Sequence, residues 1–314
     1  MKINSLVNAI ARQSWLISPE FFSANAFMVA QIMSGKLVTD DSEPPQILAY
    51  NNNVLTAMSS WHLRDLNSPD TILRIPIYGG MMKHEGPCNY GMTNVENLLF
   101  AAAANDNIVG VVLDIDSGGG EAGAVPPALA GINAFKAAGK PIVAYCDVAC
   151  SAAYWTAAAT DRIFAANDIT ATFGSIGAMT QFVDIIPHLE SLGYKVHTIY
   201  PPESSEKNKA FMLALEGKYE QITSEILSPL AQKFIDSIKA LRSFSVDDNH
   251  IVFKGATFRA NEALSINLID QIGSFEDALD FVSMKAPKLK SSRNSSNVKA
   301  NISDLKPSLK ISIS

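Results

Sequence analysis

The stretch Pro-Ile-Val-Ala-Tyr-Cys-Asp-Val-Ala-Cys-Ser-Ala-Ala-Tyr-Trp, residues 141–155, joins an apolar run to a serine and then to a helical pattern. Residues 141–145 predict a short buried strand, and residues 151–160 predict a helix. Ser151 lies between them, where free backbone N–H groups can hold an anion and the side chain projects from a turn. Ser151 is therefore a candidate nucleophile. A simpler interpretation is that it only caps the helix, since serine is among the preferred capping residues.

Strands and helices alternate on both sides of this stretch. Further strands are predicted at 71–78, 108–114, 162–165 and 195–200, and helices at 93–104, 125–138, 183–192, 217–241 and 275–284. Thr93 and Glu96 fit a capping box at the start of one helix. Strands separated by helices of this length indicate repeated βαβ units, so we predict an α/β fold with a mostly parallel sheet.

Three parts are predicted along the 314 residues. Residues 1–45 combine helical spacing of apolar residues with a proline-containing linker, and we expect a helical N-terminal extension. Residues 46–284 form the main domain, and residues 285–314 are predicted to be a disordered basic tail. The tail holds seven Lys/Arg and one Asp and so carries a charge of +6. Because the whole chain has a net charge of −6, residues 1–284 carry about −12. An acidic body argues against nucleic acid as its partner.

The cysteines and the hydropathy pattern bear on location. Three cysteines without CxxC spacing predict neither a disulfide framework nor a metal site, and they favour a reducing compartment. No run of about 18 uncharged apolar residues occurs, so no membrane span is expected, and the N-terminus is a poor secretory signal. We predict a cytoplasmic protein without a cofactor.

The glycines of residues 116–123, Asp-Ser-Gly-Gly-Gly-Glu-Ala-Gly, allow two interpretations. Gly118, Gly120 and Gly123 satisfy GxGxxG, and Asp147 lies at about the distance of a ribose contact, which would indicate a dinucleotide site. The next helix, however, begins at two prolines after the last glycine, whereas a pyrophosphate needs the helix directly behind the glycines. The other interpretation is an oxyanion hole, because a glycine turn exposes backbone N–H groups.

A nucleophilic serine needs a base. None of the five histidines lies in a glycine-rich turn at the end of a predicted strand. Lysine is the alternative, if burial lowers its pKa until the amine is neutral near pH 7. The polar loop 201–209 follows a predicted strand and holds Lys207 and Lys209. Loop lysines are most often solvated surface charges.

Four motifs, in order, resemble the signal peptide peptidase A-like serine peptidases of family S49, which include phage and prophage capsid-maturation proteases. The resemblance covers roughly residues 70–285, and its motifs are Asp-Ile-Asp-Ser-Gly-Gly-Gly at 114–120, Ala-Cys-Ser-Ala-Ala-Tyr-Trp at 149–155, Thr-Phe-Gly-Ser-Ile-Gly at 172–177, and 253–263 with 268–273. It implies a ClpP/crotonase-like fold. The chain has Gly118 where the family usually has proline, and Ala152-Ala153 in place of two glycines.

The resemblance also implies roles for individual residues. Ser151 would be the nucleophile, Lys207 the general base, and Ser175 would hold the lysine amine in place. The N–H groups of Gly119 and Ala152 would form the oxyanion hole. Lys209 is the alternative base, because the lysine loop is longer than in bacterial members.

The implied function is a serine endopeptidase with a Ser/Lys dyad that cleaves capsid, scaffold or other protein substrates during phage head assembly, as a homo-oligomer. Two other functions stay open: a catalytically inactive assembly protein, and a crotonase-like acyl-CoA enzyme, which would need no Ser151/Lys207 pair. The dinucleotide interpretation ranks last.

Overall fold

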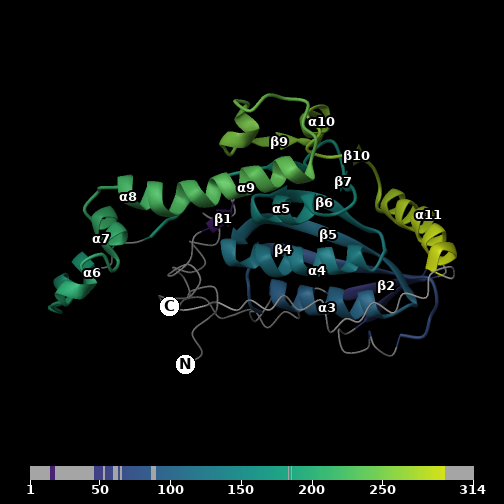
Figure 1. The fold of residues 1–314 in the computed structure, drawn as a ribbon, viewed down its shortest axis with the longest axis horizontal. Helices are drawn as coiled ribbons and strands as arrows, with labels where there is room; N and C mark the ends of the chain where they lie inside the picture. The colour runs from purple at the N-terminus through teal and green to yellow at the C-terminus, as the bar shows by residue number, and fades with distance from the viewer. Residues whose placement is uncertain are drawn as a thin grey trace.

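One ten-stranded sheet organises the chain (Figure 1). The computed structural model describes residues 15–17, 46–51, 54–58, 63, 66–85, 90–182, 184 and 186–293, and of 15–17 and 287–293 it describes the backbone only. The strand order is β10-β7-β6-β5-β4-β2-β3, with β1, β8 and β9 joined to this path at its sides. All pairs between β4, β5, β6, β7 and β10 are parallel, so the predicted α/β fold with a mostly parallel sheet is confirmed.

Three long parallel strands form the centre of the sheet, namely β4 (Thr71–Met81), β5 (Ile108–Glu121) and β6 (Ile142–Cys150). They are nearly continuous apolar runs, as expected for strands covered on both faces. Shorter strands complete the sheet: β2 (Ile47–Asn51), β3 (Val54–Met58), β7 (Ile163–Ala165), β8 (Thr172–Gly174), β9 (Thr257–Arg259), β10 (Gln271–Ile272) and β1 (Trp15–Ile17).

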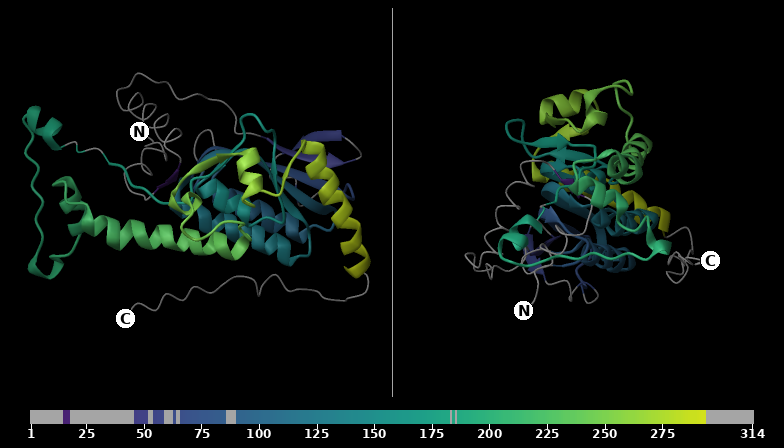
Figure 2. Two further views of the ribbon diagram at one scale, coloured as in Figure 1. Left: turned by 90° about the horizontal axis from the view of Figure 1, so that it is seen from above. Right: turned by 90° about the vertical axis from the view of Figure 1, so that its left-hand side faces the viewer.

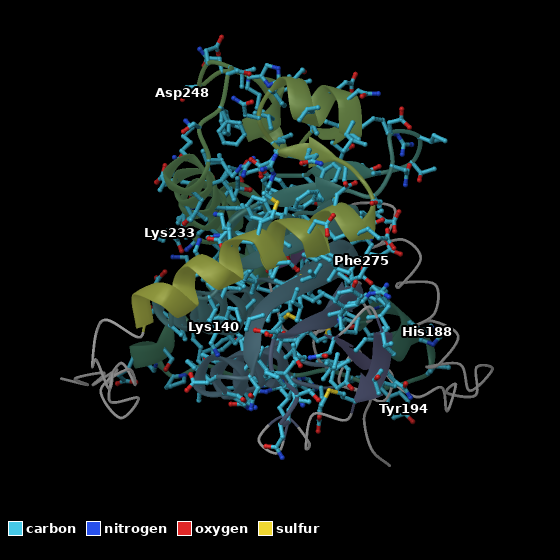
Figure 3. The ribbon with its side chains drawn as sticks, turned by 90° about the vertical axis from the view of Figure 1, so that its right-hand side faces the viewer. Lys140, His188, Tyr194, Lys233, Asp248 and Phe275 are labelled. Atoms are coloured by element: carbon cyan, nitrogen blue, oxygen red, sulfur yellow. The ribbon has the colours of Figure 1, made fainter. Side chains whose placement is uncertain are left out.

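Helices cover the two faces of the sheet unequally (Figure 2). The larger core lies on the face covered by α3 (Met92–Ala104), α4 (Val125–Ala137) and α5 (Ala152–Ala158), where Leu113, Phe135 and Phe173 are fully buried. On the other face, α11 (Phe275–Arg293) packs Leu279 and Val282 against Val112 and Val143. Figure 3 shows α11 crossing this face, with Phe275 at its N-terminal end. Between β9 and β10 lies α10 (Ala260–Ser265).

A long segment extends away from the sheet, and we call residues 179–227 the arm. It contains α6 (Ile186–Ser191), the turn η3 (Pro202–Ser204), α7 (Lys209–Leu215), α8 (Glu220–Ile222) and the π-helical turn η4 (Thr223–Leu227). The chain returns to the body through α9 (Ser228–Leu241), whose C-terminal half packs on α5. Figures 1 and 2 show α6, α7 and α8 beyond the N-terminal end of α9.

Several local predictions are wrong. Residues 195–200 are not a strand but an exposed connection within the arm, because no strand of the described chain pairs with them. The capping box at Thr93 is absent: Gly91 is the N-cap of α3, and the Thr93 hydroxyl donates to the Lys83 carbonyl instead. Strand β5 does not stop at residue 114 but continues through the glycines to Glu121.

The ends of the chain also differ from expectation where the structure describes them. Of the predicted helical extension 1–45, only Trp15–Ile17 lie within the described residues, and they form strand β1. The predicted disordered tail begins too early, because α11 continues from residue 285 to Arg293 and buries Ala286. Residues 294–314 lie outside the described part. Within the described residues, no helix has the length and apolar content needed to cross a bilayer.

Candidate active site

Ser151 lies at the turn between β6 and α5, as predicted. Its backbone has φ 55° and ψ −120°, which residues with a Cβ rarely adopt because of steric clash. Ser151 occupies the N-cap position, but its side chain makes no capping hydrogen bond. The interpretation of Ser151 as a simple cap therefore lacks the contact that defines one. A strained turn that presents a serine is instead typical of nucleophile sites.

Ser175 lies directly beside Ser151. Strand β8 pairs with β6 in parallel, with Cys150 opposite Gly174, so each serine is the next residue after a paired position. The Ser151 N–H donates to the Gly174 carbonyl at 2.8 Å. Ser175 also has φ 55°, and both serines are nearly fully buried. The structure thus brings together two of the predicted site residues.

Gly174 is needed for this arrangement. Its φ is +111°, and a Cβ there would lie 2.6 Å from the Ala256 carbonyl oxygen. The Ser175 N–H donates to that same carbonyl at 2.8 Å. Any larger residue would push apart the turn that holds the two serines.

The predicted oxyanion loop is the last part of β5. Ser117 pairs with Ala149 of β6, so Gly119 and Ser151 each lie two residues beyond a paired position on adjacent strands. Gly119 has φ +101°, and its N–H donates to the Ser117 hydroxyl at 3.1 Å. The Gly119 N–H therefore already has a hydrogen-bond acceptor in this structure. Ala152 is the first residue of α5, and its N–H has no partner inside the helix by the geometry of helix ends.

The glycines at 118–120 serve strand packing, which weakens the dinucleotide interpretation. Gly119 and Gly120 pair with Gly80 and Met81 of β4, and a Cβ on Gly120 would lie 2.0 Å from the Met81 carbonyl oxygen. A 3₁₀ turn, η2 (Ala122–Ala124), separates these glycines from α4. The helix N-terminus is thus not directly behind them, as a pyrophosphate site requires.

Lys207 and Lys209 lie on the arm. Lys207 follows η3, and Lys209 begins α7. Both side chains are exposed, and the Lys209 ammonium pairs with Glu206 at 2.9 Å. Figure 1 shows α7, which begins at Lys209, beyond the N-terminal end of α9, whereas α5, which begins directly after Ser151, packs within the body. No contact joins residues 207–209 to the serine turn within the described part of one chain. The structure does not bring the predicted base and nucleophile together.

Two aspartates near the ends of strands have structural partners, Asp161 after the motif 149–155 and Asp270 within the motif 268–273. Asp161 accepts a hydrogen bond from the Ile142 N–H and pairs with Lys136. Asp270 accepts from the Ile163 N–H at 2.7 Å and binds Arg242 at the end of α9. These carboxylates hold the ends of β6, β7 and α9 in position and lie outside the serine turn.

Sequence analysis missed a polar cluster on the opposite face of the sheet. Asp114 is buried and accepts hydrogen bonds from Arg74 and Tyr78. Burial, and then the hydrogen bond to Asp114, raise the pKa of Tyr78 to about 12. Asp116 keeps an exposed side chain, yet partial desolvation and the nearby Asp147 and Asp114 raise its pKa above the ordinary value. The signal was present as charged residues at alternate positions within apolar strands.

Known proteins resemble the region around Ser151. Residues 134–289 match the sequence model of peptidase family S49. The head-tail preconnector protein GP5 of Enterobacteria phage P21 is 29% identical over 202 residues, which are 64% of this chain and 39% of that protein. Protease 4 of Haemophilus influenzae is 25% identical over 221 residues, 69% of this chain and 35% of that protein. The chloroplastic serine protease SPPA of Arabidopsis thaliana is 31% identical over 176 residues, 56% of this chain and 26% of that protein.

The chain therefore spans well under half the length of these curated relatives. Solved structures that resemble it include an enoyl-CoA hydratase/isomerase family protein from Silicibacter pomeroyi, with TM-score 0.42, 14% identity, and coverage of 71% of this chain and 81% of that one. A ClpP1 mutant from Listeria monocytogenes has TM-score 0.41, 13% identity, and coverage of 66% and 94%.

Proposed function

The chain belongs to peptidase family S49, and from this premise we propose that it is a serine endopeptidase with Ser151 as its nucleophile. The observation that carries the proposal is the strained backbone of Ser151 at the end of β6, with Ser175 beside it on β8. Strain of this kind costs about 1–3 kcal/mol and persists only where surrounding structure enforces it. Here the hydrogen bond from the Ser151 N–H to the Gly174 carbonyl holds the strained conformation in place.

Lys207 is the proposed general base, with Lys209 as the alternative. A solvated lysine has a pKa near 10.4 and is charged at neutral pH, so it cannot accept a proton from serine. Because both lysines are exposed on the arm, we propose that the arm of a second copy delivers one of them to Ser151. Burial there would lower the lysine pKa and produce the neutral amine. Assembly of a homo-oligomer would then switch on the dyad.

The proposed reaction is peptide hydrolysis through an acyl-enzyme. The lysine amine takes the Ser151 proton as the serine Oγ bonds to the substrate carbonyl carbon. The N–H groups of Gly119 and Ala152 donate to the resulting oxyanion. For this the Gly119 N–H leaves the Ser117 hydroxyl, a rotation that glycine permits. The C–N bond breaks as the protonated lysine returns the proton to the leaving amine. Water, deprotonated by the lysine, then releases the acid and restores the Ser151 hydroxyl.

Protein substrates of phage head assembly are the proposed targets, since the phage P21 relative is a head-tail preconnector protein. We propose a cytoplasmic location, a reducing setting that suits the buried thiol of Cys146.

The test is to trap the acyl-enzyme with a fluorophosphonate probe and read the adduct by mass spectrometry. Wild type should be labelled, Ser151→Ala should not, and Lys207→Ala should lose at least a hundredfold in labelling rate, the scale of general-base catalysis. Lys209→Ala is the matched control, and a larger loss there than in Lys207→Ala would exchange the roles of the two lysines. If folded, oligomeric wild type is not labelled, the chain is an inactive assembly protein or an acyl-CoA enzyme instead.

A further inference from the structure

Strand β1 lies on the glycine-rich end of β5. Residues Trp15–Ile17 pair antiparallel with β5, with Ile17 opposite Gly119, Leu16 opposite Gly120 and Trp15 opposite Glu121. This is where the proposed oxyanion donor Gly119 lies. A segment from the start of the chain therefore reaches the centre of the candidate site.

The edge of β5 that β1 uses follows from the pairing of its neighbours. A strand has two edges, and β4 occupies one of them along Gly119 and Gly120. The other edge is held by β6 as far as Ser117, which pairs with Ala149. Strand β1 must continue on that second edge, just where β6 leaves the sheet for Ser151. Counted along the two strands, Ile17 pairs at the level of Ser151.

This edge suits an extended peptide of almost any sequence. Residues 118–120 are all glycine, so no side chain of theirs obstructs an incoming strand. An unpaired edge offers backbone N–H and C=O groups, and main-chain hydrogen bonds then supply the binding energy. A peptide held there in extended form would pass in front of the Ser151 turn.

We propose that residues Trp15–Ile17 occupy the place of a peptide substrate and keep the site closed in the intact chain. This rests on the proposed function of Ser151. Residues 18–45 connect the strand to the body, so the segment acts at the high effective concentration of a tethered ligand. The described pairing covers three residues, and a pairing of that length can be displaced by a competing peptide or partner.

The test compares the full chain with its Leu16→Pro variant, because proline removes a backbone donor and breaks strand pairing. Leu16→Val, which preserves a strand-forming residue, is the matched control. Hydrogen exchange of the fragment containing residues 119–121 should be at least tenfold faster in Leu16→Pro and unchanged in Leu16→Val. Fluorophosphonate labelling of Ser151 should also accelerate about tenfold in Leu16→Pro. This is the change expected if the site is open about a tenth of the time in the intact chain and all of the time in the variant.

A synthetic peptide with the sequence of residues 10–22 should reverse both changes in Leu16→Pro, and the same peptide with proline at position 16 should not. Unchanged exchange in Leu16→Pro would overturn the proposal, as would equal labelling rates in the two chains. If none of the chains is labelled, the proposed function fails. The exchange measurement and its reversal by the peptide would still decide whether β1 covers the glycine strand.

Discussion

At the scale of single residues, the site depends on backbone strain that its neighbours enforce. Ser151 and Ser175 both have φ 55°, a value that costs free energy for any residue with a Cβ. The Ser151 N–H donates a hydrogen bond to the Gly174 carbonyl and the Ser175 N–H donates one to the Ala256 carbonyl. These hydrogen bonds hold the two turns in place despite the cost. The strain places both hydroxyls at adjacent strand ends, and folding energy elsewhere in the core offsets it.

Glycine at position 151 relieves the strain, whereas alanine retains it. We expect Ser151→Gly to be more stable than Ser151→Ala by about 1 kcal/mol, because relief of 1–3 kcal/mol exceeds the backbone entropy that glycine loses. Urea denaturation of the two inactive variants measures the difference. Equal stabilities would mean that the serine turn is unstrained.

Asp116 makes stability depend on pH. Burial and the carboxylates of Asp147 and Asp114 raise the pKa of Asp116, so its charged form is less favourable in the folded chain than in the unfolded one. Its contribution is therefore fully favourable below the unfolded pKa, near 3.9, and is lost as pH rises through the folded value. Asp116→Asn should raise the Tm at pH 7 and leave it unchanged near pH 3.

Thermal unfolding at the two pH values tests this, with Asp168→Asn as the control at an aspartate that is not among the carboxylates acting on Asp116. A gain for Asp116→Asn that is equal at both pH values would show that repulsion among the carboxylates is not its cause.

At the scale of elements, α9 joins the arm to the body through a few buried contacts. Phe234 is fully buried, and its ring stacks on Trp155 of α5 at 4.5 Å with an angle of 5°. Ile238, one turn further along, is also fully buried. Since α5 begins directly after Ser151, the helix that carries the arm rests on the helix that follows the candidate nucleophile.

Phe234→Ala should destabilise the chain by about 3–5 kcal/mol, because it leaves a cavity against Trp155. Phe211→Ala on the arm is the matched control. Phe211 contacts Phe182 but is 42% exposed, so its truncation should cost about 1 kcal/mol or less. Urea denaturation compares the two variants, and similar losses would contradict the view that α9 is anchored at Phe234.

At the scale of the whole molecule, the arm presents apolar surface that the rest of the described chain leaves exposed. Its large exposed side chains are Leu192, Tyr194, Val196, Ile199, Tyr200, Phe211, Tyr219 and Ile226. Surfaces of this kind mark interaction sites. The same arm carries Lys207, which one chain does not bring to Ser151, so one contact between copies would both cover the apolar residues and complete the proposed dyad.

Mixing inactive variants tests the contact between copies. Ser151→Ala and Lys207→Ala should each be inactive, but a mixture that exchanges subunits should regain part of the wild-type rate of labelling. Each restored site would combine Ser151 of one chain with Lys207 of another. Recovery should be absent when both substitutions are placed in the same chain and mixed with Lys207→Ala. A mixture that stays inactive although subunits exchange would contradict a dyad shared between chains.

Much of the sheet and of the serine turn was predictable from local pattern. Apolar runs such as residues 108–114 and 141–145 mark buried strands, because continuous apolarity is needed where both faces are covered. The position of Ser151 between strand and helix followed from the same reasoning. The motif at 172–177 also identified Ser175, which the pairing of β8 with β6 then placed beside Ser151.

The sequence by itself determined the order of strands and helices, the parallel sheet and the serine turn, because these depend on short-range apolar periodicity. Only the tertiary structure decided that residues 195–200 join no strand of the described chain, that the arm, which carries Lys207, extends away from the sheet, and that β1 pairs with β5 at Gly119. These features depend on which distant segments meet. Pairing between residues 17 and 119 leaves no local pattern, since backbone hydrogen bonds along a strand edge require no particular side chain.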